Sequence, residues 1–271
     1  MTPSGLGVIG LGRMARALLM PLLEQGIIPR DQVQAVVGSE ESARRLQAEL
    51  GVAVGCDPSS AWAAPVVLLA VKPQLLEVVA SAAPPPPPAG QEAPLLLSVL
   101  AGVTLGRLEQ AFPGWRCVRA VPNTPCLVGA GITGLAWAED LPAEQRRWVR
   151  DLFASVGVVK VLPESQLDGL LALASSGPAL AAVLLEALAD GGVASGLPRA
   201  LALELALGMM SGSVALLREQ GLHPAQLKDM VASPAGTTIA ALRELERGGV
   251  RGALIEAVLA AAERSRALNS G

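Results

Sequence analysis

The hexapeptide Gly10-Leu11-Gly12-Arg13-Met14-Ala15 joins an apolar run over residues 5–10 to a helical pattern over residues 14–25. A glycine-rich turn in this position, after a strand and before a helix, is typical of a dinucleotide-binding βαβ unit. Gly10 permits the tight turn, Gly12 lets the backbone approach a pyrophosphate, and Ala15 is small enough for close helix–strand packing. The free N–H groups at the helix start favour negative charge. All six residues are therefore assigned to a cofactor site.

Short apolar runs alternate with helical patterns outward from this turn, as far as Leu162. Such alternation predicts an α/β fold with a Rossmann-like, doubly wound parallel sheet and right-handed crossovers. Strands are expected at residues 5–10, 32–37, 52–54, 66–71, 94–100, 117–121, 132–137 and 158–162. The five consecutive prolines within residues 83–90 can join neither a helix nor a central strand. They predict a stiff surface loop, with an SH3-like partner as the alternative interpretation.

Only helical patterns follow Pro163. They cover residues 166–174, 179–189, 199–219, 224–231, 238–248 and 250–268. The sequence therefore predicts a dinucleotide-binding domain at 1–163 and an all-helical domain at 164–271. Residues 201–210 are apolar almost all round the helix, and a small bundle has too little interior to bury several such helices. We expect a homodimer or higher homo-oligomer formed through this domain.

The composition is apolar and mildly acidic, with 51% hydrophobic residues, 17% charged residues and a net charge of -3. This excludes a disordered chain and gives no electrostatic reason to expect nucleic acid as a partner. Residues 169–185 carry no charge, but Ser175-Ser176-Gly177-Pro178 would break a spanning helix, which favours a buried segment over a membrane span. The first residues show no basic, cleavable leader, so a cytoplasmic protein is expected.

Several catalytic chemistries lack their residues in this sequence. There is no tyrosine, and the one histidine, His223, precedes Pro224 in a polar turn where a surface or capping role is expected. A Tyr–Lys proton relay is excluded, and a His-centred triad is disfavoured. The three cysteines are odd in number and show no metal-binding spacing, so no metal site and no disulfide framework are expected. Reduced, buried thiols are the interpretation.

The residue that follows the second expected strand bears on the choice of nicotinamide cofactor. NAD-preferring enzymes usually carry an acidic residue there for the ribose hydroxyls, whereas this chain has Ser39, with Arg44 and Arg45 one turn on. An arginine can pair with a 2′-phosphate, so we favour NADPH, with Ser39 and Arg44 as contacts. NADH remains possible, because the two arginines could equally form an ordinary solvated helix face.

Two further turns follow strands at the carboxyl edge of the sheet, where ligands bind. Val71, Lys72 and Pro73 follow the fourth strand, and Lys72 is one of only three lysines, although an exposed lysine at a loop start fits equally well. Val121-Pro122-Asn123-Thr124-Pro125 is a rigid turn with two prolines around a polar pair. Val71, Lys72, Pro73 and Asn123 are assigned to the cofactor site.

The string Ser233-Pro234-Ala235-Gly236-Thr237-Thr238 precedes a helical pattern. Threonine is a good N-cap, and the string would present several amides and hydroxyls at a helix N-terminus. Such a pocket suits a small carboxylate. Capping alone would explain one threonine but does not require the whole string.

Taken together, these strings resemble pyrroline-5-carboxylate reductases over nearly the whole chain. The resemblance rests on residues 10–15, 71–73, 122–125, 176–179 (Ser-Gly-Pro-Ala) and 233–238. The chain departs from the family pattern at Ala235, where a glycine is usual, and at Leu180, where an aromatic residue is usual. Val121-Pro122 also replaces the methionine common before Asn-Thr-Pro. These departures concern the fine shape of the pocket more than the chemistry.

The resemblance implies a Rossmann domain, a helical domain that interlocks with its twin, and NAD(P)H-dependent reduction of the cyclic imine 1-pyrroline-5-carboxylate to L-proline. By resemblance the substrate carboxylate binds the loop 233–238, with Ser233, Gly236, Thr237 and Thr238 as contacts. Holding the cofactor and the imine close supplies most of the acceleration. If an acid is needed, the Thr238 hydroxyl or a water is the candidate.

Two rival functions are considered. The nearest enzyme rival is a β-hydroxyacid dehydrogenase or a related imine reductase. The dehydrogenases carry a catalytic lysine on the first long helix of the second domain, but the lysines here are Lys72, Lys160 and Lys228. A non-catalytic NADP sensor would be expected to keep the glycine motif and lose the carboxylate loop, whereas this sequence has both. The reductase is the preferred interpretation.

Overall fold

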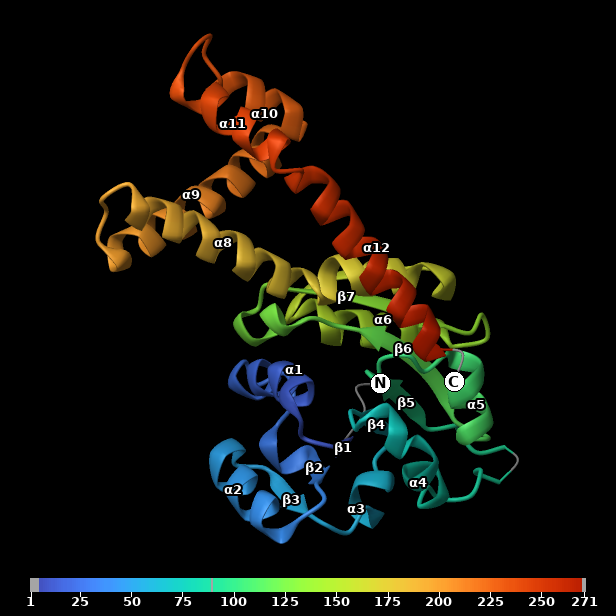
Figure 1. Ribbon diagram of the computed structural model, residues 1–271. Helices are drawn as coiled ribbons and strands as arrows, with labels where there is room; N and C mark the ends of the chain where they lie inside the picture. The colour runs from blue at the N-terminus through green and yellow to red at the C-terminus, as the bar shows by residue number, and fades with distance from the viewer. Residues whose placement is uncertain (1–4, 89, 270–271) are drawn as a thin grey trace. The chain divides into compact units, whose positions relative to one another are not determined.

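The computed structural model describes residues 5–88 and 90–269 (Figure 1). Contacts divide the chain into two compact units. Unit 1 comprises residues 1–176 together with 261–271, and unit 2 comprises residues 177–260. The end of the last helix therefore belongs to unit 1, an arrangement that periodicity along the sequence does not predict.

Unit 1 is built on an eight-stranded sheet of order β3-β2-β1-β4-β5-β6-β7-β8. The strands are β1 (Leu6–Ile9), β2 (Val33–Val36), β3 (Ala53–Gly55), β4 (Val66–Leu69), β5 (Leu95–Ser98), β6 (Arg116–Val121), β7 (Gly131–Trp137) and β8 (Gly157–Val161). Neighbours pair in parallel except β6 and β7, which are antiparallel. This pair corrects the expected all-parallel sheet. Between these strands lies only η3 (Thr124–Val128), which is too short for the crossover that a parallel pair needs.

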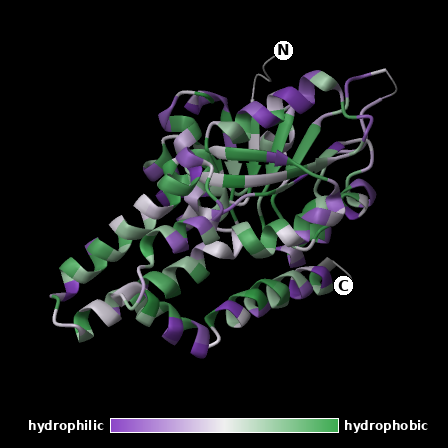
Figure 2. Ribbon diagram, turned by 90° about the horizontal axis from the view of Figure 1, so that it is seen from above, coloured by the Kyte–Doolittle hydropathy of each residue, from purple (hydrophilic) through white to green (hydrophobic). Residues whose placement is uncertain are grey.

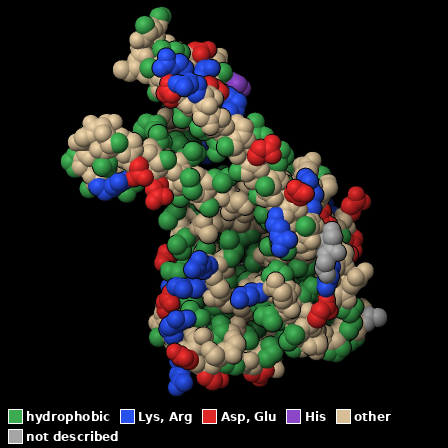
Figure 3. All heavy atoms as spheres, viewed as in Figure 1, with side chains coloured by type: hydrophobic (Ala, Val, Ile, Leu, Met, Phe, Trp, Pro, Cys, Tyr) green, Lys and Arg blue, Asp and Glu red, His purple; other side chains and the backbone are tan. Residues whose placement is uncertain are grey.

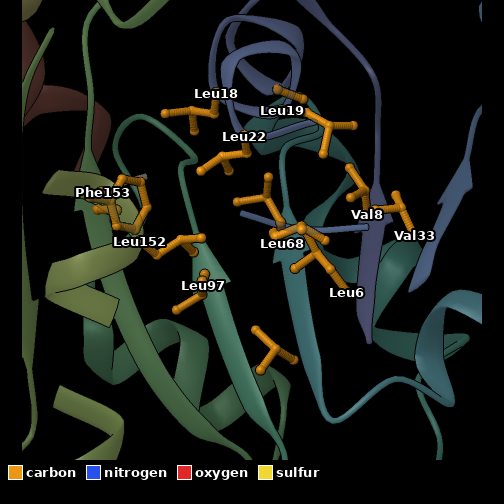
Figure 4. Close-up of a cluster of buried hydrophobic side chains, with 14 of the residues drawn as sticks. Leu6, Val8, Leu18, Leu19, Leu22, Val33, Leu68, Leu97, Leu152 and Phe153 are labelled. Atoms are coloured by element: carbon orange, nitrogen blue, oxygen red, sulfur yellow. The ribbon is translucent and has the colours of Figure 1, made fainter. Parts of the chain in front are cut away.

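Helices cover both faces of the sheet, as a doubly wound fold requires. They are α1 (Arg13–Glu24), α2 (Glu40–Leu50), α3 (Ser59–Trp62), α4 (Leu76–Ser81), α5 (Leu105–Ala111) and α6 (Ala143–Ala154), with short turns η1 (Arg30–Gln32) and η2 (Pro73–Leu75). Successive strand residues belong to separate core clusters, for example Leu68 to the cluster of α1 and α6, and Leu69 to the cluster of α3 and α5. Figure 4 shows the first cluster, in which Leu18, Leu22 and Phe153 face the strand residues.

The polyproline stretch lies between α4 and β5 and has no regular structure over residues 84–88, as predicted. It is mostly exposed, and Pro86 and Pro87 lie against Gly114, where an added Cβ would come within 2.8 Å of Pro86. Ala89, within the same predicted loop, lies outside the described residues.

A segment of residues 164–176 runs along unit 1 before the chain enters unit 2. It contains η4 (Glu164–Gln166), α7 (Leu167–Leu170) and the π-helical turn η5 (Leu171–Ser175). Leu167 and Ala172 are fully buried, and contacts divide the chain after Ser176. The domain boundary after Pro163 stays a prediction. The expected break at Ser175–Pro178 is replaced by the π turn, in which Ser176 N donates to Leu171 O (2.9 Å).

Unit 2 contains α8 (Gly177–Ala194), α9 (Arg199–Gln220), α10 (Pro224–Val231), α11 (Thr237–Arg247) and the first half of α12 (Val250–Asn269). Helices α8 and α9 pack against each other, and hydrophobic residues occur nearly all round them (Figure 2). The stretches Glu164–Ala194 and Arg199–Gln220 are long and apolar enough to cross a membrane by length and composition alone. Only 6% and 11% of their most apolar windows are buried in the single chain.

Candidate active site

The glycine-rich turn has the geometry that a pyrophosphate site requires. Gly10 has φ +93°, and a Cβ there would lie 2.7 Å from the Ala70 carbonyl oxygen, so only glycine fits without strain. Gly12 is the N-cap of α1 and has no side-chain capping bond, and nothing lies within 4 Å of the position a Cβ would take. Ala15 is fully buried, as close packing of helix and strand predicts. The helix N-terminus is therefore open for an anion.

A cleft of about 800 Å³ lies at this carboxyl edge of the sheet. Its lining joins the ends of β1, β2 and β4: Gly10, Leu11, Gly12, Val37, Gly38, Ser42, Arg45, Leu46, Ala70, Val71, Lys72, Gln74 and Leu75. The structure thus brings together five of the predicted cofactor residues from two separate strings. Arg13, Met14 and Ala15 lie in the first turn of α1, and Pro73 begins η2 beside the cleft.

The far end of the cleft is formed by α2. Ser39 caps this helix, accepting a hydrogen bond from Ser42 N (3.3 Å) and donating one to Ser42 Oγ (3.0 Å). Arg44, the predicted phosphate contact, donates back to Glu40 O (3.4 Å) and lines a different hollow beside Gly51. Arg45 lines the cleft instead, together with Ser42. Figure 3 shows Lys and Arg side chains on the face that carries α1 and α2.

The sequence analysis did not assign Ser42 or Arg45 to the cofactor site. Their positions around α2 would have distinguished Arg45 from Arg44. Ser42 and Arg45 are three residues apart and share a face beside the buried Leu46, whereas Arg44 lies about 100° away round the helix.

The Asn123 side chain makes two hydrogen bonds within unit 1, and its assignment to the cofactor site stays a prediction. Its side chain is buried, Nδ2 donates to Ala174 O (3.0 Å), and Oδ1 accepts from Ile132 N (2.8 Å). Both polar atoms of the amide are thus engaged within unit 1. Its side chain fixes the loop after β6, and it lies outside the lining of the cleft.

The predicted carboxylate loop lies in unit 2, at the start of α11. Gly236, and not a threonine, is the N-cap, and no side chain makes a capping bond there. Gly236 N already donates to Ser233 O (3.0 Å), and a Cβ at Gly236 would fall 2.3 Å from Ser233 Oγ. The amides of Thr237 and Thr238 lie in the first turn of the helix, where backbone N–H groups have no partner within the helix. Ala235, where the resembled family has glycine, has φ 57°.

His223 is the N-cap of α10, as the sequence predicts. Its Nδ1 accepts from Ala225 N (3.2 Å), and Gln226 completes a capping box by accepting from His223 N (2.8 Å). The three cysteines are free thiols, two of them buried and Cys56 partly exposed. Burial raises the pKa of Cys117 and of Cys126, which leaves both in the unreactive thiol form at neutral pH.

Comparison with known proteins identifies both regions. Residues 164–268 match the family described as pyrroline-5-carboxylate reductase dimerisation, and residues 5–102 match the one described as NADP oxidoreductase, coenzyme F420-dependent. A pyrroline-5-carboxylate reductase of Synechocystis is 45% identical over 266 residues and covers 97% of each chain. The corresponding protein of Glycine max is 38% identical over 265 residues, 97% of this chain and 96% of its own.

Solved structures agree with the sequence relatives. The pyrroline carboxylate reductase of Plasmodium falciparum, with NADP bound, superimposes with a TM-score of 0.89 at 29% identity and covers 99% of each chain. The Streptococcus pyogenes reductase superimposes with a TM-score of 0.88 at 29% identity, over 97% of this chain and 98% of that one. Both the dinucleotide-binding half and the helical half are thus shared with these proteins.

Proposed function

The chain belongs to the pyrroline-5-carboxylate reductase family, and on that premise we propose which of its residues bind and reduce the substrate. Its activity is the NAD(P)H-dependent reduction of 1-pyrroline-5-carboxylate to L-proline, the last step of proline biosynthesis. The observation that carries the assignment of residues is the presence of two anion sites in one chain. One is the open N-terminus of α1, and the other is the open N-terminus of α11.

The pyrophosphate of the cofactor binds the amides of the turn 10–15. The turn fits the group because Gly12 leaves open space at the helix N-terminus and Gly10 adopts a positive φ that a side chain would strain. Leu11, Val71 and Lys72 line the adjoining wall of the cleft, and Pro73 fixes its edge. Bound NADPH supplies the hydride, and these residues orient the cofactor.

NADPH is the proposed cofactor, because the far end of the cleft offers hydroxyls and a cation instead of a carboxylate. Ser42 and Arg45 line that end, and Ser39 donates a hydrogen bond to Ser42. Arg45 takes the part first assigned to Arg44. Arg45→Ala should lower kcat/KM with NADPH by about tenfold or more and leave the value with NADH nearly unchanged. Arg44→Ala is the matched control and should leave the preference for NADPH intact. A loss of preference in Arg44→Ala alone would restore the original assignment.

The substrate carboxylate binds the start of α11 in unit 2. The amides of Thr237 and Thr238 and the Ser233 hydroxyl are its donors, and Gly236 contributes by leaving room. The helix dipole adds to the attraction, since the first-turn amides point at the anion. Thr238 also offers a hydroxyl as the proton donor, in a chain without tyrosine and with its one histidine engaged as a helix cap.

A cytoplasmic homodimer, or a higher homo-oligomer, is the proposed form of the enzyme. The support is the match of residues 164–268 to a dimerisation region and the exposed apolar surface of α8 and α9. A second copy would remove this surface from water. The proposed partners include neither nucleic acid nor a membrane.

The test is NADPH oxidation by the purified protein with and without 1-pyrroline-5-carboxylate. We expect oxidation only with substrate, and a fall in kcat of at least about tenfold in Thr238→Ala. Thr238→Ser keeps the hydroxyl and should retain most of the activity. Cofactor binding without any turnover would identify a sensor instead of an enzyme. Equal kcat in both variants would remove Thr238 from the proton-transfer step.

A further inference from the structure

Arg119 is a buried arginine that neither the cofactor cleft nor the carboxylate loop uses. It lies in β6 and is only 1% exposed. Its Nη1 donates to Glu164 Oε1 (2.9 Å), and its Nη2 lies 3.6 Å from Asp168 Oδ1. A charge buried this deeply is tolerated only when it is paired, so the two carboxylates are its required partners.

The two carboxylates connect Arg119 to three other parts of unit 1. Glu164 Oε1 also accepts from Leu105 N (2.8 Å) at the start of α5. Asp168 Oδ1 accepts from Ser265 Oγ (2.7 Å), and Ser265 is a buried residue of α12, in the part that belongs to unit 1. Through these carboxylates Arg119 is linked to the segment 164–176, after which the chain enters unit 2, and to the end of α12, which again belongs to unit 1.

The same segment of residues 164–176 is bonded to the end of β6 a second time. Asn123 Nδ2 donates to Ala174 O (3.0 Å), and Ser175 Oγ donates to Pro122 O (2.8 Å). The segment is thus fixed to β6 at both ends, by Arg119 at one and by the loop after the strand at the other. Between these anchors lies the π turn Leu171–Ser175, a rare geometry that is frequently found at functional sites.

The loop after β6 lies on the edge of the sheet where the cofactor binds. Strands β1, β4, β5 and β6 are parallel, so their carboxyl ends share that edge. In a doubly wound sheet the dinucleotide spans this edge across the switch point, which here lies between β1 and β4. The adenosine half of the dinucleotide then lies over the carboxyl end of β2, and its nicotinamide half extends toward the carboxyl ends of β5 and β6.

We propose that Arg119 is a positioning residue for hydride transfer, which acts by fixing the segment 164–176, and through it the loop 122–125, beside the nicotinamide end of the cleft. This inference rests on the proposed placement of the cofactor. It predicts that loss of the arginine's links changes the reaction step more than it changes cofactor affinity, because Arg119 lies outside the lining of the cleft.

The test compares two variants that avoid a buried, unpaired charge. The triple variant Arg119→Met, Glu164→Gln, Asp168→Asn removes all three charges while the amides can still accept from Leu105 N and Ser265 Oγ. Arg119→Lys keeps the charge, but a single ammonium cannot reproduce the forked link. We expect kcat to fall by about tenfold in the triple variant and less in Arg119→Lys, with the Kd of NADPH unchanged within about twofold. The primary deuterium isotope effect on kcat, measured with NADPH deuterated at the transferred position, should rise.

Arg116→Met is the matched control, since Arg116 lies in the same strand but pairs with the exposed Glu92 (3.8 Å). It should retain wild-type kcat and isotope effect. Wild-type kcat in the folded triple variant or in Arg119→Lys would overturn the proposal, as would a parallel loss of NADPH affinity. If wild-type protein binds NADPH but does not oxidise it with the imine, the proposed function fails, and that result is distinct from any failure in the variants.

Discussion

Units 1 and 2 hide their hydrophobic side chains to very different extents. In unit 1 both faces of the sheet are covered, and the core clusters contain large residues such as Leu19, Leu97 and Phe112 at 1% exposure or less. Among the described residues of unit 2 the buried hydrophobics are alanines: Ala189, Ala202 and Ala206. Leu205, Leu207 and Met209 of α9 are about half exposed. Unit 1 thus buries its large hydrophobic side chains by itself. Unit 2 leaves them exposed, as is typical of a surface that another protein chain covers.

The largest expected effect comes from placing a charge on that surface. Leu205→Glu should raise the dissociation constant of the proposed dimer by about 100-fold or more, because an unpaired charge buried in an interface costs several kcal/mol. Size-exclusion chromatography with light scattering measures the mass, and activity should fall with it. Val78→Glu, at a 65% exposed position in unit 1, is the control and should change neither. An unchanged dimer in Leu205→Glu would show that this face of α9 lies outside the interface.

A pair of glycine variants separates folding from binding within unit 1. Gly10→Ala introduces a left-handed alanine and an overlap with Ala70 O, so it should lower the free energy of unfolding by about 3 kcal/mol. Gly12→Ala meets no atom within 4 Å and has φ -71°, so stability should change by less than about 1 kcal/mol. The added methyl occupies the approach of the pyrophosphate, so the Kd of NADPH should rise by about tenfold or more. Unchanged NADPH affinity in Gly12→Ala would contradict the cofactor site.

Sequence reasoning succeeded where short-range patterns decide the structure. The glycine turn, the alternation of strands and helices and the cap at His223 depend on neighbouring residues only, and the structure has all three. The antiparallel β7 and the π turn were missed, because hydrophobic periodicity gives neither strand direction nor helix type. The bond from Ser265 to Asp168 spans 97 residues and leaves no pattern in the sequence. The partner of Gly236 N is a backbone oxygen, which no side-chain motif reveals.

A buried thiol of unit 1 should make stability depend on pH in the alkaline range; all three cysteines lie in this unit. Burial, and then the charge of Glu109, raises the pKa of Cys117 from 9.0 to about 12. The folded state therefore holds the thiol proton more tightly, and its contribution to stability is complete below pH 9 and lost as the pH rises toward 12. Stability should fall by about 1.4 kcal/mol per pH unit over this range. Cys117→Ala should flatten that slope relative to wild type more than Cys56→Ala does, because Cys56 is partly exposed, although desolvation and Glu40 raise the pKa of its thiol as well. An equal slope in all three proteins would contradict the assignment.

The smallest effect tests whether unit 2 stores strain at the proposed substrate loop. Ala235 is the one described non-glycine residue with positive φ, at 57°, directly before the N-cap of α11. An L-residue in this region is strained by about 1 kcal/mol, and glycine relieves that strain while adding some entropy to the unfolded chain. Ala235→Gly should therefore raise the free energy of unfolding by about 0.5 kcal/mol, measured by denaturant titration. Ala240→Gly in α11 is the control and should lower stability by about 1 kcal/mol.

If Ala235→Gly is stabilising and KM for the imine is unchanged, the departure from the family glycine is a local strain that the assembled enzyme tolerates. A lower KM would show instead that the alanine restricts the amides that hold the carboxylate.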